Sequence, residues 1–368
     1  MGPLVESGVS IMRRLKAAAR VLIQPEQVVA SAAGLTEAQV KQVRSFFPLE
    51  KFFILGHARS GTTLLARLVR LHPEVHCNYQ AHFFTRPPYL TSLLNDPETV
   101  AWLRRRNNRW NLGQDPSNEI LRVAADYLME REARRLNKRV VGDKSPSNMA
   151  NGEAVRRLHD LYPESRLISI VRDGRDVAVS HLMQAFVDDV DELNASQRRI
   201  RSVLLRDPQA FQAQHRSLFG RRDLRQRALA WSRNVEETER LGRELLQDRF
   251  LQVRYEDLVR QPLRVISSVW SFLEVAPDFP GASGQVEAAC VENPDADWQK
   301  QSLPGLANWV SKGGPGAWKE WFNLQDRAIF ESEAGGLMMR LGYEPSDAGA
   351  GSDPGGQPDQ PLSPRSRA

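Results

Sequence analysis

Short apolar runs alternate with helix-like patterns along the central part of this chain. Continuous stretches of Phe, Ile, Leu and Val, typical of strands buried on both faces of a parallel sheet, predict four strands. The predicted strands lie at residues 51–56, 139–142, 167–171 and 250–253. Apolar residues at helical spacing follow them, at residues 61–71, 152–162, from 174 onward and 257–273. Strands alternating with helices predict a three-layer α/β/α fold with a central parallel sheet and right-handed crossovers.

The remaining segments carry weaker patterns. Residues 72–138 read as loop and helix, residues 185–224 are polar with weak periodicity, and the chain beyond 274 is rich in Pro and Gly. A long helix passes through Trp231 and ends near Leu246. The whole pattern predicts a helical N-terminal extension over 1–48, one domain over 49–344 and a disordered tail over 345–368. Residues 9–23 are amphipathic, which predicts a helix packed on the domain or, alternatively, lying on a membrane surface.

Composition narrows the class of protein. The chain has 368 residues, 41% of them hydrophobic, and no apolar run of 18 residues, so we expect no integral membrane segment. The two cysteines, Cys77 and Cys290, give neither metal-ligand spacing nor a disulfide framework, which favours a cytoplasmic protein. The net charge of +5 suits an anionic ligand. Because no aromatic residues are interleaved with the basic clusters, we expect no nucleic-acid partner. The oligomeric state stays open.

The stretch from Gly56 to Leu65 directly follows the first apolar run. A strand, a tight loop bounded by glycines and a Leu-rich helix offer backbone N–H groups and a positive helix end to an anion. The spacing from Gly56 to Gly61 is that of a P-loop, but Thr62 stands where a nucleotide-triphosphate loop needs Lys. The cation, Arg59, lies inside the loop instead. The sequence therefore predicts a P-loop-like phosphate site that does not bind ATP with magnesium.

Further donor groups follow later strands. Arg172 lies at the carboxyl end of the strand 167–171, and Ser180 lies about two helical turns into the next helix. Together they can bind a second anion. The Lys312-Gly313 loop offers a third group, a cation with flexible backbone N–H groups. Ligands of parallel sheets bind at the carboxyl ends of the strands, where all these residues fall. By itself, Arg172 would be a surface ion pair with Asp173 or Asp176.

Four segments in this order resemble the sulfotransferase family. They are Arg59–Leu64, similar to the 5′-phosphosulfate loop; Arg172–Ser180, similar to the 3′-phosphate motif; Arg254–Leu258, similar to the Tyr-Glu-Asp segment; and Ser311–Phe322, similar to the Lys-Gly and Trp-Lys segment. The resemblance covers roughly residues 50–343. Its N-terminal half is similar to the tyrosine-protein and carbohydrate branch, and its C-terminal loop to cytosolic members, with Ser311 in place of their Arg.

The resemblance implies 3′-phosphoadenosine 5′-phosphosulfate as sulfuryl donor, an acceptor hydroxyl or amine, and no metal. It assigns donor binding to Arg59, Ser60, Gly61, Thr62, Thr63, Arg172, Ser180, Tyr255, Lys312 and Gly313, with Tyr255 near the adenine. It makes Arg59 and Lys144 catalytic, with Lys144 neutralising the bridging oxygen of the leaving phosphate. Read alone, Lys144 would be an exposed lysine starting a loop. Trp318 and Phe322 are expected in the core of a segment that closes over the nucleotide.

The general base is less clear from the sequence. Where the tyrosine-protein branch carries Glu, this chain has Tyr79 or Gln80, neither of which is a base near neutral pH. His82 is the nearest titratable substitute, with an ordinary pKa of about 6.5, and is otherwise a structural residue beside Phe83. His57, inside the loop, is the second candidate.

Two other functions remain as alternatives. One is a P-loop kinase or nucleoside-triphosphatase, which needs magnesium and a Lys in place of Thr62. The other is a non-catalytic nucleotide-binding protein of the same fold. The acceptor is not readable, because residues 80–135 and 185–224, its expected walls, are irregular. Small-molecule, carbohydrate, lipid and peptide acceptors all stay open.

Overall fold

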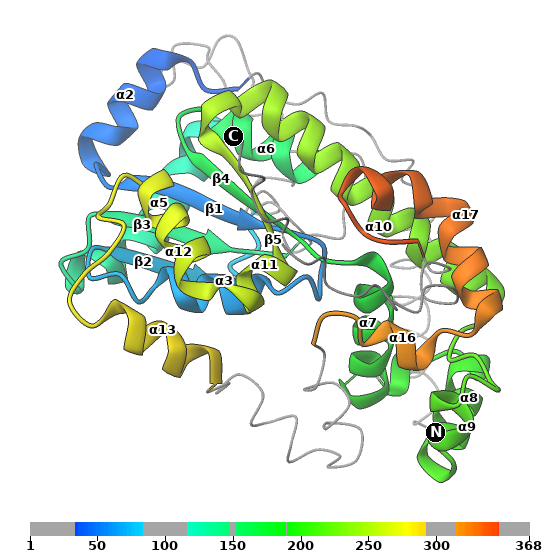
Figure 1. Ribbon diagram of the computed structural model, residues 1–368. Helices are drawn as coiled ribbons and strands as arrows, with labels where there is room; N and C mark the ends of the chain where they lie inside the picture. The colour runs from blue at the N-terminus through cyan, green and yellow to red at the C-terminus, as the bar shows by residue number, and fades with distance from the viewer. Residues whose placement is uncertain (1–33, 84–115, 147–151, 189, 292–313, 346–368) are drawn as a thin grey trace, which may run out of the picture.

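Five parallel strands form the centre of the protein. The computed structural model describes residues 34–83, 116–146, 152–188, 190–291 and 314–345 (Figure 1). Within them the sheet has the order β2-β3-β1-β4-β5, and each neighbouring pair is parallel. The strands are β1 (Glu50–Leu55), β2 (Val75–Tyr79), β3 (Val140–Lys144), β4 (Arg166–Val171) and β5 (Phe250–Arg254). The parallel sheet expected from the sequence is confirmed.

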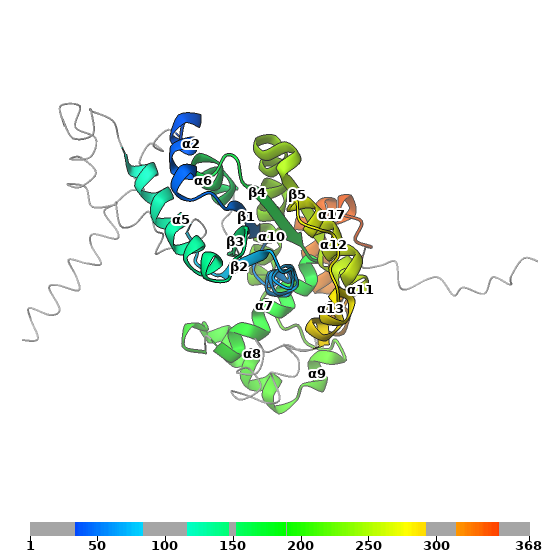
Figure 2. The same cartoon turned by 90° about the vertical axis from the view of Figure 1, so that its left-hand side faces the viewer.

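Side chains alternate along β1 between two cores. Phe52 and Ile54 pack in the core of α3 (Thr62–Val69), α12 (Pro262–Phe272) and α13 (Ala282–Val291). Phe53 and Leu55 pack on the opposite face with α5 (Ser117–Arg135) and α6 (Glu153–Leu161). Figure 2 shows these two groups of helices on either side of the sheet. The three-layer α/β/α arrangement is therefore also confirmed, because both faces of each inner strand are covered.

A third core lies beyond the carboxyl ends of the strands, where α7 and α16 are seen in Figure 1. Its centre is made by Trp231, Phe186 and Phe330, which are at most 1% exposed. The helices that supply it are α7 (Gly174–Asp188), α8 (Ala195–Arg206), α9 (Gln209–Gln212), α10 (Arg221–Leu241), α16 (Trp318–Trp321) and α17 (Leu324–Arg340). Short turns η2 (Val190–Glu192), η3 (Gly242–Leu246) and η4 (Gln247–Arg249) join them to their neighbours. Packing in this third core holds α7 against the carboxyl ends of the strands.

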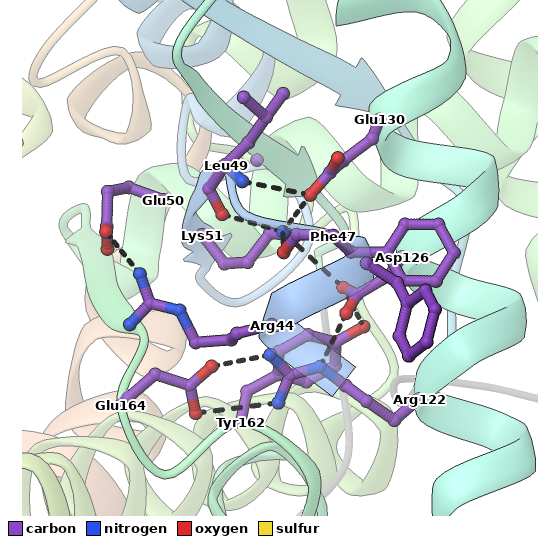
Figure 3. A network of polar contacts seen from close by, with 12 residues as sticks. Arg44, Phe47, Leu49, Glu50, Lys51, Arg122, Asp126, Glu130, Tyr162 and Glu164 are labelled. Atoms are coloured by element: carbon purple, nitrogen blue, oxygen red, sulfur yellow. Dashed lines mark hydrogen bonds and ion pairs between the residues drawn. The ribbon is translucent and has the colours of Figure 1, made fainter. Parts of the chain in front are cut away.

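A buried ionic network closes the amino end of β1 (Figure 3). Lys51 Nζ lies 2.6 Å from Glu130 Oε1 and 3.7 Å from Asp126 Oδ1, both on α5. Arg122 contacts Asp126 at 2.8 Å and also donates to the Leu161 carbonyl oxygen after α6. Because each charge has an opposite partner, the network fixes α5 on the sheet without leaving a buried charge alone. It lies far from the strand ends at which the candidate site is built.

The N-terminal part of the described chain begins next to α6. The backbone N–H of Leu35 donates to the Asp160 carbonyl oxygen, and a capping box at Thr36 starts α2 (Glu37–Phe46). The predicted three-part division of the chain stays a prediction. Residues 1–33, with the amphipathic segment 9–23, and the tail from 346 lie outside the described residues.

Four local expectations differ from the structure. Strand β2 occupies part of a segment read as loop and helix, because an edge strand with polar residues has no continuous apolar run. The helix expected over 257–273 is two helices, α11 (Tyr255–Arg260) and α12, divided before Pro262, whose missing N–H fits a helix start. The polar segment 185–224 contains α8 and α9. Helices α13 and α17 lie in the segment beyond 274.

Candidate functional site

A tight loop joins β1 to α3 and holds the first predicted anion-binding residues. A Cβ atom on Gly56 would come within 2.7 Å of the Ile170 carbonyl oxygen on β4. Gly61 has a φ of 91° at the start of α3, a conformation that strains other residues. A Cβ there would also lie 2.3 Å from the Tyr255 ring. The two glycines therefore let β4 and Tyr255 approach the loop closely.

Between the glycines, polar groups are held in defined positions. Arg59 has a φ of 72°, and its Nε donates a hydrogen bond of 3.1 Å to Ser180 Oγ on α7. The Ser60 hydroxyl is buried and lacks a hydrogen-bond partner among the described residues. A buried hydroxyl without a hydrogen-bond partner costs free energy. A bound anion that accepts its hydrogen bond would remove this cost. Ser60, beside the positive end of α3, therefore fits a phosphate ligand.

Arg172 follows β4 and joins three parts of the site. Its guanidinium donates to the carbonyl oxygens of Arg59, at 3.3 Å, and Gly314, at 3.4 Å. It also lies 4.5 Å from the centre of the Tyr255 ring and 3.8 Å from Asp176 Oδ2. At 4% exposed, Arg172 is buried rather than a surface ion pair. The structure thus brings this arginine to the loop, a contact that the sequence did not predict, while its role in donor binding stays a prediction.

The segment before α16 is held on α7 by a buried carboxylate. Asp176 accepts the backbone N–H groups of Gly316 and Trp318, both at 2.8 Å. Burial raises the pKa of Asp176 to about 6, and the nearby Arg172 opposes that rise. Trp318 is 3% exposed and Phe322 is fully buried, as expected for core residues of this segment. Lys312 and Gly313 lie outside the described residues.

Glu256 is a site-supporting residue that the sequence did not single out. Its Oε1 accepts the backbone N–H of Asp173 at 2.9 Å, and its Oε2 accepts the Tyr343 hydroxyl at 3.1 Å. Asp173 in turn pairs with Arg175, whose guanidinium lies 3.8 Å from the Trp318 ring centre. The Tyr-Glu-Asp segment therefore orders the turn after β4. Its place in that segment was the sequence signal for Glu256, but the sequence assigned it no role.

Lys144 ends β3 and points toward the loop. Its Nζ donates to Thr63 Oγ1 at 3.2 Å and lies 5.0 Å from the centre of the Tyr79 ring. The guanidinium of Arg70 lies 4.8 Å from the same ring. The reading of Lys144 as an exposed lysine is wrong, since it is 1% exposed. A buried ammonium at the mouth of a phosphate loop can stabilise a leaving oxyanion.

The two candidate bases lie in different surroundings. His82 is buried in a turn after β2, with a φ of 52°, and its backbone N–H donates to Ser145 Oγ at 2.9 Å. His57 Nδ1 lies 3.0 Å from the Ala58 carbonyl oxygen, which can only accept, so Nδ1 carries the proton in the neutral ring. Burial lowers the pKa of His57 below its ordinary value, opposed by this hydrogen bond.

His181, directly after Ser180, is a titratable neighbour of the loop that the sequence did not indicate. Arg227 Nη1 lies 2.7 Å from His181 Nδ1, and since an arginine can only donate, Nδ1 accepts. Burial, followed by the charges of Arg227, His57 and Arg59, lowers the pKa of His181 to about 4. A neutral histidine therefore lies on α7 directly after Ser180, the predicted 3′-phosphate residue.

The described residues contain neither a cluster of metal ligands nor a membrane-spanning helix. No three His, Cys, Asp or Glu side chains in the described ranges gather as metal ligands would. None of the helices in those ranges is both long and apolar enough to cross a membrane.

Comparison with known proteins places the chain in a family. A model of the sulfotransferase family matches residues 51–204 and 202–279. An uncharacterised Aquifex aeolicus protein is 29% identical over 211 residues, covering 56% of this chain and 26% of that protein. Chicken protein-tyrosine sulfotransferase 2 is 23% identical over 305 residues, covering 80% of this chain and 69% of that protein. The alignment thus spans about a quarter of the first relative and two thirds of the second.

Among solved structures, mouse sulfotransferase SULT7A1 complexed with PAP aligns with a TM-score of 0.44 and 14% identity, covering 83% of this chain and 90% of that one. The family match covers more than half of the chain, and the chain belongs to the sulfotransferase family. The resemblance drawn from the four sequence segments is therefore confirmed.

Proposed function

We propose that this chain transfers a sulfuryl group from 3′-phosphoadenosine 5′-phosphosulfate to an acceptor hydroxyl or amine. One observation carries the proposal, which is that three cations gather where β1 passes through its loop into α3, one from the loop itself and one each from the ends of β3 and β4. Arg59 extends from the loop to Ser180, Arg172 binds the loop carbonyl of Arg59, and Lys144 binds Thr63. Membership of the sulfotransferase family supports it.

The donor residues divide between its two anionic ends. Arg59, Ser60, Gly61, Thr62 and Thr63 would hold the 5′-phosphosulfate, and the buried Ser60 hydroxyl supports this assignment. Arg172 and Ser180 would hold the 3′-phosphate, with Lys312 and Gly313 added from outside the described residues. Tyr255, packed on Gly61, would lie beside the adenine.

Catalysis requires a cation at the leaving oxygen and a base at the acceptor. In the reaction a bond forms from the acceptor oxygen to sulfur, and the bond from sulfur to the bridging phosphate oxygen breaks. Lys144 and Arg59 would neutralise the charge that develops on that bridging oxygen. The acceptor proton would pass to His82, with His57 as the second candidate. Removal of the base should lower turnover by roughly a hundredfold or more.

The proposed function is tested first by ligand binding. Adenosine 3′,5′-bisphosphate without magnesium should raise Tm, since it binds only the folded state. ATP with magnesium should not. The reverse pattern would favour a P-loop kinase or nucleoside-triphosphatase. Transfer is then measured with labelled donor and a panel of small-molecule, carbohydrate, lipid and peptide acceptors. Binding without transfer to any of them would favour a non-catalytic nucleotide-binding protein.

We also propose a cytoplasmic location. Cys77 is buried and Cys290 is exposed, and both are free thiols, which suits a reducing compartment. Fractionation of cells that express the full chain tests this, and recovery in a secretory compartment would contradict it.

A further inference from the structure

A buried carboxylate lies next to Lys144 on β3 and takes no part in the proposed chemistry. Asp143 is 2% exposed. In the parallel register Asp143 is opposite Phe53 and Lys144 is opposite Ile54, so their side chains leave opposite faces of the sheet. While Lys144 reaches the loop, Asp143 faces a pocket lined by Phe53, Leu55, Phe83 and Leu158. No salt bridge to Asp143 is formed within the described part of the chain.

The hydrogen bonds of Asp143 all lead to the turn that follows β2. One carboxylate oxygen accepts the backbone N–H of Ala81 at 3.2 Å, and the other accepts the Ser145 hydroxyl. Ser145 Oγ in turn accepts the backbone N–H of His82. The carboxylate thus controls two consecutive N–H groups of the turn, one directly and one through Ser145.

This turn needs such an anchor. Gln80 and His82 have φ angles of 54° and 52°, in the left-handed region that is unfavourable for residues other than glycine. The N–H of Gln80 donates to the Lys144 carbonyl oxygen at 2.7 Å and so prolongs the β2–β3 pairing by one residue. Beyond that bond, the backbone N–H groups of Ala81 and His82 are held by Asp143 and Ser145. Backbone strain of this kind persists only where the surroundings hold it.

The carboxylate is itself in an unfavourable position. Burial raises the pKa of Asp143 from 3.8 to about 6, opposed by the hydrogen bonds from Ser145 and Ala81 and by the charge of Lys144. An asparagine would be buried there at lower cost, since it carries no charge. Strongly perturbed carboxylates next to a reaction centre are candidates for a functional role.

We propose that Asp143 is a positioning residue for the reaction, which fixes the turn at Ala81 and His82 and thereby presents His82 beside Lys144. The inference rests on the proposed function, because it gives the turn a purpose only if His82 serves the acceptor. Strand β3 would then supply Lys144, the cation at its end. One residue earlier it would supply Asp143, which anchors the turn that carries His82.

The test compares Asp143→Asn with wild type by two independent readouts. In the variant, exchange of the Ala81 and His82 amide hydrogens should become at least tenfold faster, because one carboxylate oxygen is replaced by an NH2 group, which can only donate, so one of the two acceptors of Ala81 and Ser145 is lost. The kcat should fall at least tenfold while the Kd for adenosine 3′,5′-bisphosphate changes less than twofold. Ser145→Ala removes the hydroxyl that links Asp143 to His82 and keeps the direct Ala81 contact, so exchange and kcat should change in the same direction by a smaller factor.

A matched control distinguishes a positioning role of Asp143 from the general effect of neutralising a buried carboxylate. Asp126→Asn alters a fully buried carboxylate at the opposite end of the sheet, in the network of Figure 3. It should lower Tm and leave both the exchange of Ala81 and His82 and the kcat within twofold of wild type. In a His82→Ala background, Asp143→Asn should change kcat less than twofold, because the two residues act through one another.

The outcomes distinguish this inference from the proposed function. Unchanged amide exchange in Asp143→Asn overturns the anchoring role, and faster exchange with unchanged kcat overturns its role in the reaction. An additive loss in the double variant overturns action through His82. Wild-type protein that binds the bisphosphate and transfers no sulfuryl group contradicts the proposed function instead, and the exchange measurement still decides the anchoring.

Discussion

Arg59 and Ser180, 121 positions apart in the chain, are joined by a hydrogen bond of 3.1 Å from the Arg59 Nε to the Ser180 hydroxyl. One residue belongs to the loop after β1 and the other to α7 after β4, and these strands are neighbours in the sheet. The two predicted anion sites are therefore parts of one surface. Removing a residue of either site should therefore disturb the other.

Gly61→Ala should abolish donor binding and lower stability. The new Cβ would meet the Tyr255 ring at 2.3 Å, and the backbone φ of 91° would be strained. A strained backbone position of this kind costs about 1–3 kcal/mol. Gly281→Ala is the control, because Gly281 has a φ of 85° and an open environment away from the loop. Thermal denaturation should show destabilisation in both variants, and calorimetry should show lost bisphosphate affinity only in Gly61→Ala. Equal affinity in the two would remove Tyr255 from the nucleotide site.

Arg172→Ala should weaken binding of adenosine 3′,5′-bisphosphate more than tenfold. A charge-assisted hydrogen bond contributes about 1.5–3 kcal/mol, and the variant also removes the contacts of Arg172 with the Arg59 carbonyl oxygen and the Tyr255 ring. Ser180→Ala should act in the same direction with a smaller effect, since it removes one hydroxyl. Arg225→Ala, which breaks only an exposed pair with Glu333, serves as the control and should bind like wild type. Calorimetric Kd values decide the matter, and wild-type affinity in Arg172→Ala would end the 3′-phosphate assignment.

Lys144→Met should reduce kcat at least a hundredfold and change bisphosphate affinity little, because the ammonium is needed mainly as charge develops on the leaving oxygen. Lys51→Met provides a contrast, since Lys51 is also a buried lysine but lies at the amino end of the sheet (Figure 3). That change removes one of two cations from Glu130 and from Asp126, which keep Arg134 and Arg122, and should destabilise the fold by about 1.5–3 kcal/mol. Steady-state kinetics should therefore show the larger loss of kcat in Lys144→Met, and urea denaturation the larger loss of stability in Lys51→Met. A normal kcat in Lys144→Met would move the charge stabilisation to Arg59.

His181 should remain neutral down to about pH 4 in the folded chain, because burial and the charge of Arg227 disfavour its protonated form. Its folded pKa lies below the unfolded value of 6.5, so the folded state binds fewer protons in this interval. The associated stability is fully present above pH 6.5 and is lost as the pH falls toward 4. At pH 5 the loss is roughly 2 kcal/mol, at about 1.4 kcal/mol per pKa unit.

His181→Gln, which cannot titrate, should lose this part of the pH dependence. The raised pKa values of Asp143 and Asp176 act in the opposite sense, giving stability that falls as the pH rises toward 6, but they are common to both proteins and cancel in the comparison. Urea denaturation at pH 7.5 and pH 5 measures the difference, and NMR titration of the His181 ring measures the pKa itself. A His181 pKa near 6.5 would contradict the burial of this ring beside Arg227.

The sequence by itself determined the layers of the fold and the family. Buried parallel strands need continuous apolar residues, so β1 and β4 could be read directly. Edge strand β2 could not, because its pairing with β3 alone supports it. Helix α17 contains Gly335 and Gly336, which weaken its local pattern, and it forms because Phe330 and Leu337 pack in the third core.

Only the tertiary structure decided how the candidate residues meet. The sequence placed Arg172 and Lys144 at strand ends, yet their burial and their contacts to the loop depend on strand order, which is a property of the whole chain. Glu256 lies within the Tyr-Glu-Asp segment without a role that the sequence assigns, and His181 and Asp143 only neighbour the residues that the sequence singled out. Their environments are made by residues distant in sequence, and a carboxylate or imidazole acquires a shifted pKa only when such residues exclude water around it.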